Sequence, residues 1–233
     1  MSKRAGRRSQ QQNDFLQPLT PVSVSATDVG TDRAFNNGAA TVSFSLPSGS
    51  PAATSFTATS SPGGYTATGS SSPLTVQGLQ SATSYTFTVT ATNASGTSAA
   101  SSASSAITAT TVPATPGAPT ASSSVENQDT VSWSPVATGG KAITLYRWTS
   151  SDGKSGTTTS TSVTLTQEGG TSQTYQVRAE NANGNGQYSA SSNSVTTIAP
   201  PSFPFFPFFP YFPYFPPSFG PYFPPYFGGF VGT

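Results

Sequence analysis

The 233-residue sequence contains no cysteine and no histidine. The first absence excludes disulfide bonds and thiolate chemistry, and the second excludes imidazole metal ligands and every nucleophile that a histidine activates. Charge is also scarce, because Asp, Glu, Lys and Arg make up 7% of the residues, against about 25% in a typical soluble domain. The formal net charge is +1, so no strong overall field draws the chain to nucleic acid or to a membrane surface.

Long apolar segments are absent as well. The first twenty residues have no apolar core of the kind that a secretory signal needs. No apolar run reaches the length of about 18 residues that a membrane-spanning helix requires. We therefore expect no membrane partner, and we expect synthesis in a cytoplasm from which the protein leaves only by cell lysis or inside a larger particle.

The carboxylates are few and scattered. Of the eight Asp and Glu residues, Asp28 and Asp32 lie close together, in an expected loop between the first two strands. A calcium loop needs several closely spaced oxygen ligands, and a glycosidase needs two apposed carboxylates. We therefore interpret this pair as a solvated loop and predict no catalytic residue, no metal site, no cofactor and no enzymatic activity.

Composition divides the chain into a basic polar arm (1–19), two central segments (20–112 and 113–199) and a tail (200–233). The central segments form an internal repeat: ATNASGTSAASSASSAIT at 91–108 aligns with AENANGNGQYSASSNSVT at 179–196, 88 residues later. ATVSFS at 40–45 likewise matches DTVSWS at 129–134, at an offset of 89. Two tandem domains are expected, joined through TVPATPGAPT at 111–120, whose three prolines favour a semi-stiff connection.

Apolar residues alternate with hydroxyl residues in each copy, and no helical periodicity is present. In 85–92, for example, Tyr85, Phe87, Val89 and Ala91 alternate with threonines. This period indicates antiparallel strands with one face on a core and the other in water. About seven short strands in each copy predict an all-β fold of two-sheet sandwiches.

The spacing of residues around this strand resembles the E–F corner, F strand and F–G loop of a fibronectin type III domain. The matching positions are Leu79, Thr83, Tyr85, Phe87, Val89, Ala91, Asn93, Gly96 and Ser98. The resemblance implies that Tyr85 forms the tyrosine corner of the family. In the second copy it implies that Trp133 is the core tryptophan of strand B and that Ile143, Tyr146 and Trp148 belong to strand C.

Each copy also departs from the family pattern. The first has Phe44 in place of the tryptophan, and Ser81 where a proline is usual. The second has Gln173 at the tyrosine-corner position, so we expect its corner to be built differently, around Gly169-Gly170. No Arg-Gly-Asp sequence is present, so the resemblance implies no integrin binding.

Three charged residues fall on neighbouring strands, namely Arg147 on strand C and Arg178 and Glu180 on strand F. They form either a cross-strand ion pair, which we favour, or a recognition patch. A second candidate surface, for a polysaccharide, consists of Tyr188 with the loop 183–185, together with Tyr65.

The arm carries four of the nine basic residues, Lys3, Arg4, Arg7 and Arg8. It is an anchor on an acidic partner or a solubilising terminus. Four charges without interleaved aromatic residues argue against nucleic acid.

The uncharged tail holds fifteen Phe and Tyr residues among its 34. From Pro201 to Pro216 proline recurs at every third position, which matches the three residues per turn of polyproline II and excludes a regular sheet ladder. Such an apolar segment in water promotes association, so we interpret it as an anchor that bundles with other copies or lies in a groove of a partner. Its partner-binding residues are predicted to be Phe205, Phe206, Phe208, Phe209, Tyr211, Phe212, Tyr214, Phe215, Tyr222, Phe223, Tyr226 and Phe227.

Tandem fibronectin type III domains without a secretory signal and with two adhesive ends resemble virion structural proteins of tailed bacteriophages, including cyanophages. The resemblance implies a decoration, appendage or fibre component of the virion, assembled in the host cytoplasm, whose partners are other virion proteins or further copies of itself. The alternative is an adhesin module that binds a polysaccharide of the host surface.

Overall fold

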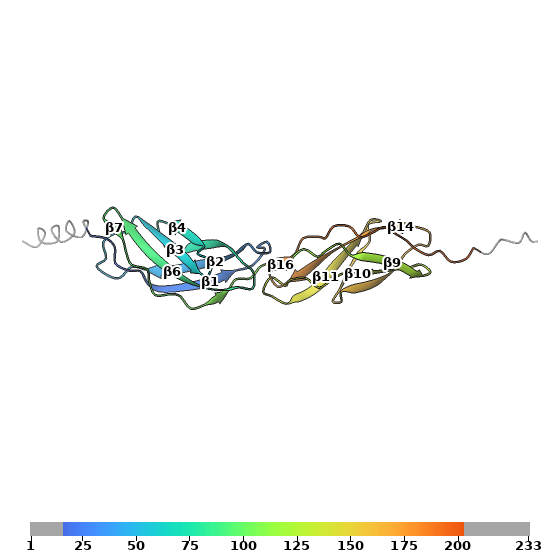
Figure 1. The fold of residues 1–233 in the computed structure, drawn as a ribbon, viewed down its shortest axis with the longest axis horizontal. Coiled ribbons are helices and arrows are strands. Elements are labelled where there is room, and N and C mark those ends of the chain that lie inside the picture. Colours follow the sequence, from blue (N-terminus) through green and yellow to red (C-terminus); the bar gives the residue numbers. More distant parts are fainter. Residues whose placement is uncertain (1–15, 203–233) are drawn as a thin grey trace, which may run out of the picture. The chain divides into compact units, whose positions relative to one another are not determined.

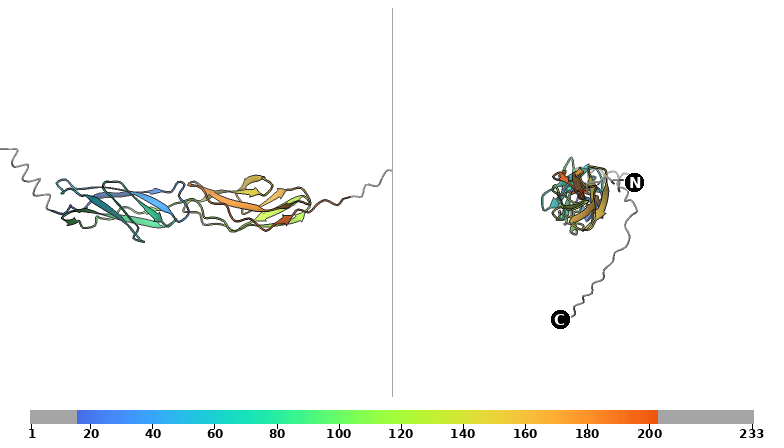
Figure 2. Two further views of the ribbon diagram at one scale, coloured as in Figure 1. Left: turned by 90° about the horizontal axis from the view of Figure 1, so that it is seen from above. Right: turned by 90° about the vertical axis from the view of Figure 1, so that its right-hand side faces the viewer.

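The computed structural model describes residues 16–202, in which the backbone forms strands and loops and no helix (Figures 1 and 2). The all-β class is therefore confirmed for these residues. The described residues up to Pro200 belong to one compact unit, and both sandwiches lie within it. Most of the predicted arm and nearly all of the predicted tail fall outside the described residues.

The strands of the first sandwich are β1 (Val22–Val29), β2 (Gly38–Ser45), β3 (Ser55–Ser61), β4 (Thr66–Gly69), β5 (Leu74–Leu79), β6 (Ser84–Asn93), β7 (Gly96–Thr97) and β8 (Ile107–Thr108). The strands of the second are β9 (Thr120–Val125), β10 (Gln128–Ser132), β11 (Ile143–Ser150), β12 (Ser155–Thr158), β13 (Ser162–Thr166), β14 (Ser172–Gln173), β15 (Tyr175–Asn181), β16 (Gly184–Asn185) and β17 (Val195–Thr196).

The two sandwiches share one antiparallel topology. In the first, the sheet β1-β2-β5 packs on β4-β3-β6-β7, and β8 also pairs with β6. In the second, β9-β10-β13 packs on β12-β11-β15-β16, and β14 pairs with β17. This order, A-B-E against C′-C-F-G, is the fibronectin type III arrangement, so the expectation of two tandem domains of that fold is confirmed.

Alternating side chains of both sheets form each core. In β6 the inward residues Tyr85, Phe87, Val89 and Ala91 are buried, and the intervening threonines are partly exposed. Phe44 of β2, which replaces the tryptophan, contacts Phe56 with ring centroids 4.9 Å apart. In the second sandwich Trp133 is buried against Tyr146 of β11, at 5.4 Å. Each sandwich therefore has an aromatic pair between its two sheets, whether the position holds Phe44 or Trp133.

The corner between strands E and F differs between the two copies. The Tyr85 hydroxyl accepts a 3.0 Å hydrogen bond from the Gln80 amide, which confirms the predicted tyrosine corner. Gln173 instead accepts a 2.8 Å hydrogen bond from the Ser151 hydroxyl. The chain turns through Gly170, whose φ of +82° favours glycine and whose amide donates to the Thr197 carbonyl. The second corner is thus built differently, as expected.

A serine ladder, formed by Ser98, Ser101 and Ser104 in the first sandwich and by Ser189 and Ser192 in the second, borders each F strand. Each amide of these serines donates to a carbonyl of the F strand, and each hydroxyl accepts from the amide of the same F-strand residue. Three ladder residues therefore match two strand residues. Because two strand residues advance about 6.6 Å, the ladder advances about 2.2 Å per residue, more tightly coiled than a strand.

Candidate functional site

The predicted anchoring residues Lys3, Arg4, Arg7 and Arg8, and the tail residues from Phe205 to Phe227, lie outside the described residues. Their anchoring role stays a prediction. The structure instead reveals four features within residues 16–202 that sequence reasoning placed only in part. These features are the joint between the sandwiches, a charged cluster on β15, a buried polar network and a groove beside β1.

The joint is the connection between the sandwiches through Thr110, Thr111 and Val112. Thr111 is 0% exposed, and its amide donates to the Gly139 carbonyl at 2.8 Å. Its hydroxyl lies 2.6 Å from that of Ser81, at the corner of the first sandwich. The Val112 amide donates to the Arg33 carbonyl at 3.0 Å. The connector is therefore hydrogen-bonded to loops of both sandwiches, which is a firmer connection than its prolines alone would make.

Two asparagines at the end of strand F of the second sandwich complete the joint. The Asn183 side-chain amide donates to the Thr110 hydroxyl at 2.7 Å and to the Thr111 carbonyl at 3.2 Å. The Asn181 side-chain amide donates to the same Thr111 carbonyl at 2.9 Å and to the Thr138 carbonyl at 2.8 Å. Both asparagines are buried, so these bonds are shielded from competing water.

The prediction that Asp28 lies in a solvated loop is wrong, because this residue belongs to β1. Its carboxylate accepts hydrogen bonds from the amide of Thr110, at 3.0 Å, and from the Thr110 hydroxyl. Asp32, by contrast, lies exposed in the turn, as expected. The structural role of Asp28 was missed because a carboxylate near a predicted loop gives no sign, in the sequence, of a partner 82 residues away.

Steric fit adds to the hydrogen bonds of the joint. A Cβ atom at Gly30 would lie 2.1 Å from the Thr110 hydroxyl oxygen and 2.7 Å from the Asn183 amide nitrogen. Both distances are far below van der Waals contact, so only glycine allows the first sandwich to approach these side chains. The joint therefore depends on a close approach of backbone at Gly30.

The charged cluster contains an ion-pair network on the outer face of β11 and β15. Arg147 and Arg178 are cross-strand neighbours, and both donate to one oxygen of Glu180, at 2.9 and 3.1 Å. The Arg178 guanidinium also lies over the Tyr188 ring, 4.9 Å from its centroid. The favoured cross-strand ion pair is present, and Glu180 separates two like charges that would otherwise repel each other.

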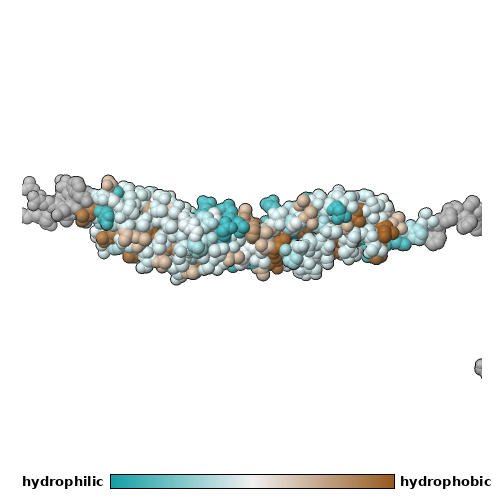
Figure 3. Space-filling model, viewed as in Figure 1, coloured by the Kyte–Doolittle hydropathy of each residue, from teal (hydrophilic) through white to brown (hydrophobic). Residues whose placement is uncertain are grey.

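The polysaccharide surface predicted from Tyr188, Tyr65 and loop 183–185 is not assembled as expected. Asn183 is 8% exposed and its amide is used in the joint. Tyr65 belongs to the first sandwich, where its ring packs against the Tyr85 ring with centroids 6.0 Å apart, whereas Tyr188 lies in the second sandwich. Figure 3 shows a mostly pale surface over both sandwiches, neither strongly hydrophilic nor strongly apolar. The candidate sugar contacts therefore do not form one exposed platform.

A buried carboxylate lies at the core of the second sandwich. Asp129 of β10 is 0% exposed and accepts hydrogen bonds from the hydroxyls of Tyr175, at 2.7 Å, and Thr197, at 2.9 Å. The Gln167 amide donates to the Tyr175 hydroxyl at 2.9 Å, and the Lys154 ammonium donates to the Gln167 side chain. Burial, and then the bond to Asp129, raise the pKa of Tyr175 well above its ordinary value of 10.0.

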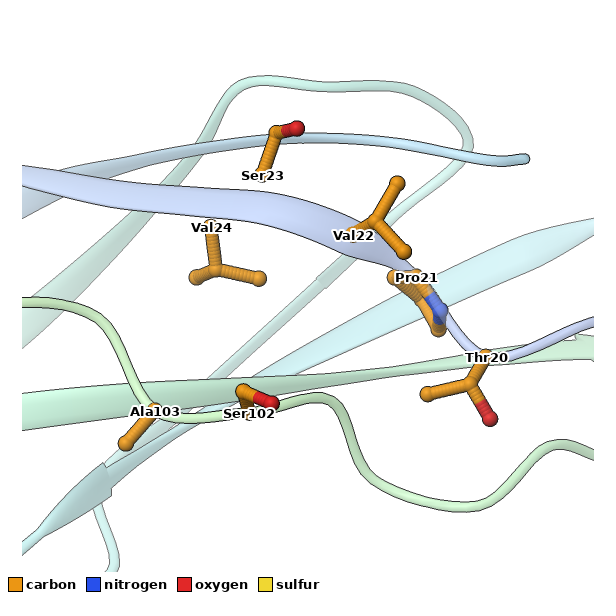
Figure 4. Close-up of a pocket in the computed structure, with 7 residues that line it drawn as sticks. All are labelled: Thr20, Pro21, Val22, Ser23, Val24, Ser102 and Ala103. Atoms are coloured by element: carbon orange, nitrogen blue, oxygen red, sulfur yellow. The ribbon is translucent and has the colours of Figure 1, made fainter.

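The edge groove, with a volume of about 350 Å³, is lined by Thr20, Pro21, Val22, Ser23, Val24, Ser102 and Ala103. Figure 4 shows the start of β1 beside the serine-ladder segment, with Val24 on the side that faces Ser102 and Ala103. No charged residue lines the groove. The sequence did not predict this groove, because the alternation of apolar and polar residues in β1 does not show that the edge of this strand borders a coiled segment.

Among residues 16–202, no three His, Cys, Asp or Glu side chains gather where they could hold a metal ion. In the same part of the chain no helix is long and apolar enough to cross a membrane.

No protein-family model matches the sequence, and no curated protein resembles it significantly in sequence. Among solved structures, the chain is similar to the FN1–FN3 domains of chicken CNTN1, with 18% identity and a TM-score of 0.49, over 78% of this chain and 67% of that one. It is also similar to the twitchin kinase region from C. elegans, with 20% identity and a TM-score of 0.34, over 37% of this chain and 17% of that one. What the described residues establish is a fold: two fibronectin type III sandwiches in tandem.

Proposed function

We propose that the protein is a non-enzymatic structural component of a tailed bacteriophage particle, as a decoration, appendage or fibre component. Its arm (1–19) and tail (200–233) anchor it to other virion proteins or to further copies of itself, and the two sandwiches serve as display or spacer modules. Assembly takes place in the host cytoplasm, and the protein then resides in the virion. Nucleic acid and membrane are not among its proposed partners.

The observation that carries the spacer role is the joint. A module that displays or spaces something must transmit position from one domain to the next, which a freely jointed linker does not do. Here the connector residue Thr111 is fully buried, and side chains of Asp28, Asn181 and Asn183 bond the connector from both sandwiches. This network supports a fixed connection between the two modules.

The anchoring role is supported by where the unusual sequence lies. The described sandwiches carry few charges and are rich in Ser and Thr, and both arginines of the charged cluster are paired with Glu180. The concentrated basic residues lie at 3–8, and the concentrated aromatic residues lie at 203–230. Segments with these compositions gain binding energy only against a partner surface, by charge pairing at one end and by apolar burial at the other.

Purified particles test this proposal. Particles released by lysis of the producing cells are banded on a density gradient, and their proteins are identified by mass spectrometry. The full chain is expected to band with the particles, and a chain that ends at Pro200 is expected to stay in the soluble fraction. Recovery of the full chain only as soluble protein, with no particle-bound fraction, would contradict the proposal.

The adhesin alternative rests on the exposed part of loop 183–185 and on Tyr188, and no contact in the structure favours it. Its test is binding of the full chain to an array of host-envelope polysaccharides, with an Asn185→Ala variant as comparison. Saturable binding that this variant loses would favour an adhesin over a spacer.

A further inference from the structure

We propose that the Pro/Phe/Tyr-rich tail of one copy docks in the edge groove of a second copy, beside β1 of its first sandwich. The inference rests on the proposed anchoring function of the tail and names the surface that receives it. Repetition of this contact links copies head to tail, which generates rings if the rotation closes and filaments if it does not.

The edge groove has the chemistry of a receptor for an uncharged apolar segment. Its lining consists of hydroxyl residues and small apolar residues, and 44% of the surface of Val22 is exposed. Two further large apolar side chains precede it in the chain, Leu19 at 46% and Leu16 at 57% exposure. Half of the six large hydrophobic residues exposed within 16–202 therefore lie in the short segment that leads into the groove. Such a concentration of exposed apolar residues marks an interaction surface.

The backbone of β1 favours an occupant that is not a regular strand. β1 is an edge strand, which pairs with β2 and has an open edge toward the groove. Its register shifts between Val22 and Ser25, and Ser23 has a φ of 55°. A bulge of this kind interrupts the even row of donors and acceptors that a regular added strand needs. An extended segment that forms isolated hydrogen bonds meets no such obstacle.

The tail matches both requirements. It has no charged residue, and its prolines from Pro201 to Pro216 remove every third amide donor and leave every carbonyl as an acceptor. In polyproline II the residues between the prolines form two aromatic rows, which supply apolar side chains to a shallow groove. The lining includes the hydroxyl residues Thr20 and Ser102, which can donate to such acceptors without a charge to desolvate.

The position of the groove favours the tail of a second copy over the chain's own tail. β1 runs from the groove at Val22 to the joint at Val29 and Gly30, about 25 Å at 3.3 Å per residue. In the second sandwich β15 ends at the joint, and the chain leaves at the other end, where the Asn127 amide donates to the Ile198 carbonyl. A chain's own tail would therefore spend roughly fifteen residues, at about 3.1 Å each, in returning past both sandwiches. That would use up the proline repeat before the groove.

Photocrosslinking of the full chain tests the proposal. Benzoylphenylalanine replaces Ser102 in the groove, and a matched control replaces Thr68, an exposed residue of β4 in the other sheet. Each probe-bearing chain is mixed with ¹⁵N-labelled wild-type chain, irradiated and digested with chymotrypsin. The expected result is a crosslink from position 102 to ¹⁵N-labelled peptides within 203–219, with little from position 68. Crosslinks to the unlabelled tail alone, to residues 1–15, or equally from both positions would overturn the proposal.

Sedimentation equilibrium of full-length variants separates the groove from the anchoring function. Val22→Glu places a charge in the groove and is expected to raise the self-association Kd at least about tenfold. Val125→Glu, at an exposed valine of β9, is expected to leave the Kd within about twofold. If Val22→Glu leaves the self-association Kd unchanged, the groove is not the docking site of the tail, whereas the anchoring function of the tail still stands. A wild-type chain that stays monomeric, with a protease-sensitive tail, would overturn the anchoring function itself.

Discussion

The side-chain amide of Asn183 in the second sandwich donates a 2.7 Å hydrogen bond to the hydroxyl of Thr110 at the end of the first. This contact joins two modules that the sequence presents as separate repeats. Because Thr110 also donates hydrogen bonds to Asp28, a continuous series of hydrogen bonds links β1, the connector and the loop after β15. The joint is therefore a part of the folded structure, and single substitutions are expected to loosen it.

Gly30→Ala is expected to open the joint. The added methyl group would lie 2.1 Å from the Thr110 hydroxyl oxygen, so the two sandwiches must separate or the backbone must shift, at about 1–3 kcal/mol. Hydrogen exchange of the Thr111 amide, measured by NMR, is expected to accelerate. Gly117→Ala in the same connector is the control, since a Cβ there meets no atom within 4 Å. Equal exchange rates in both variants would show that the joint does not depend on this close approach.

Tyr175→Phe is expected to destabilise the second sandwich by about 2–3 kcal/mol, because it deprives a buried carboxylate of a hydrogen-bond donor. Tyr85→Phe removes the tyrosine-corner bond of the first sandwich, which involves no charged group and joins the amide of the exposed residue Gln80, and is expected to cost about 1 kcal/mol. Both tryptophans of the chain, Trp133 and Trp148, lie in the second sandwich, so their fluorescence during urea unfolding reports that sandwich alone. Circular dichroism reports the strands of both sandwiches, so a transition that it shows and fluorescence does not belongs to the first. Equal losses of stability in Tyr175→Phe and Tyr85→Phe would show that the bond to the buried carboxylate of Asp129 has no added effect on stability.

The raised pKa of Tyr175 predicts alkaline sensitivity of the second sandwich. The unfolded chain releases the tyrosine proton near the ordinary pKa of 10.0, whereas the folded chain holds it to higher pH. The free energy of unfolding is therefore unaffected by this group below pH 10 and falls as the pH rises above 10. Thermal unfolding between pH 8 and 11, followed by tryptophan fluorescence, is expected to show a steeper loss in wild type than in Tyr175→Phe. The same loss of stability with pH in wild type and in Tyr175→Phe would contradict the raised pKa of Tyr175.

Ser101→Ala tests the serine ladder. The Ser101 hydroxyl accepts a 2.9 Å hydrogen bond from the Val89 amide, so the substitution leaves a buried donor unpaired, at about 1–3 kcal/mol. Ser105→Ala removes an exposed hydroxyl nearby and is expected to change stability by less than about 0.5 kcal/mol. Urea unfolding followed by circular dichroism measures both. A loss at position 105 as large as that at position 101 would contradict the ladder.

The sequence predicts the parts of this fold that depend on local pattern. The alternation around Phe87 predicts strand F and its core face, and the spacing around Tyr85 predicts a corner that the structure contains. It does not predict the joint, because the burial of Asn183 depends on how two domains meet in space. A signal did exist for Asp129, which shares the inward face of Val131 and Trp133 and so had to be a buried carboxylate. The three-residue spacing of Ser98, Ser101 and Ser104 likewise signals the ladder.

Assembly of the protein is proposed to depend on its tail. Light scattering of the full chain and of a chain ending at Pro200, over a range of concentrations, tests it most directly. The full chain is expected to form defined assemblies whose mass grows with concentration, and the shortened chain is expected to be a folded monomer. The same monomeric mass for both chains at every concentration would contradict it.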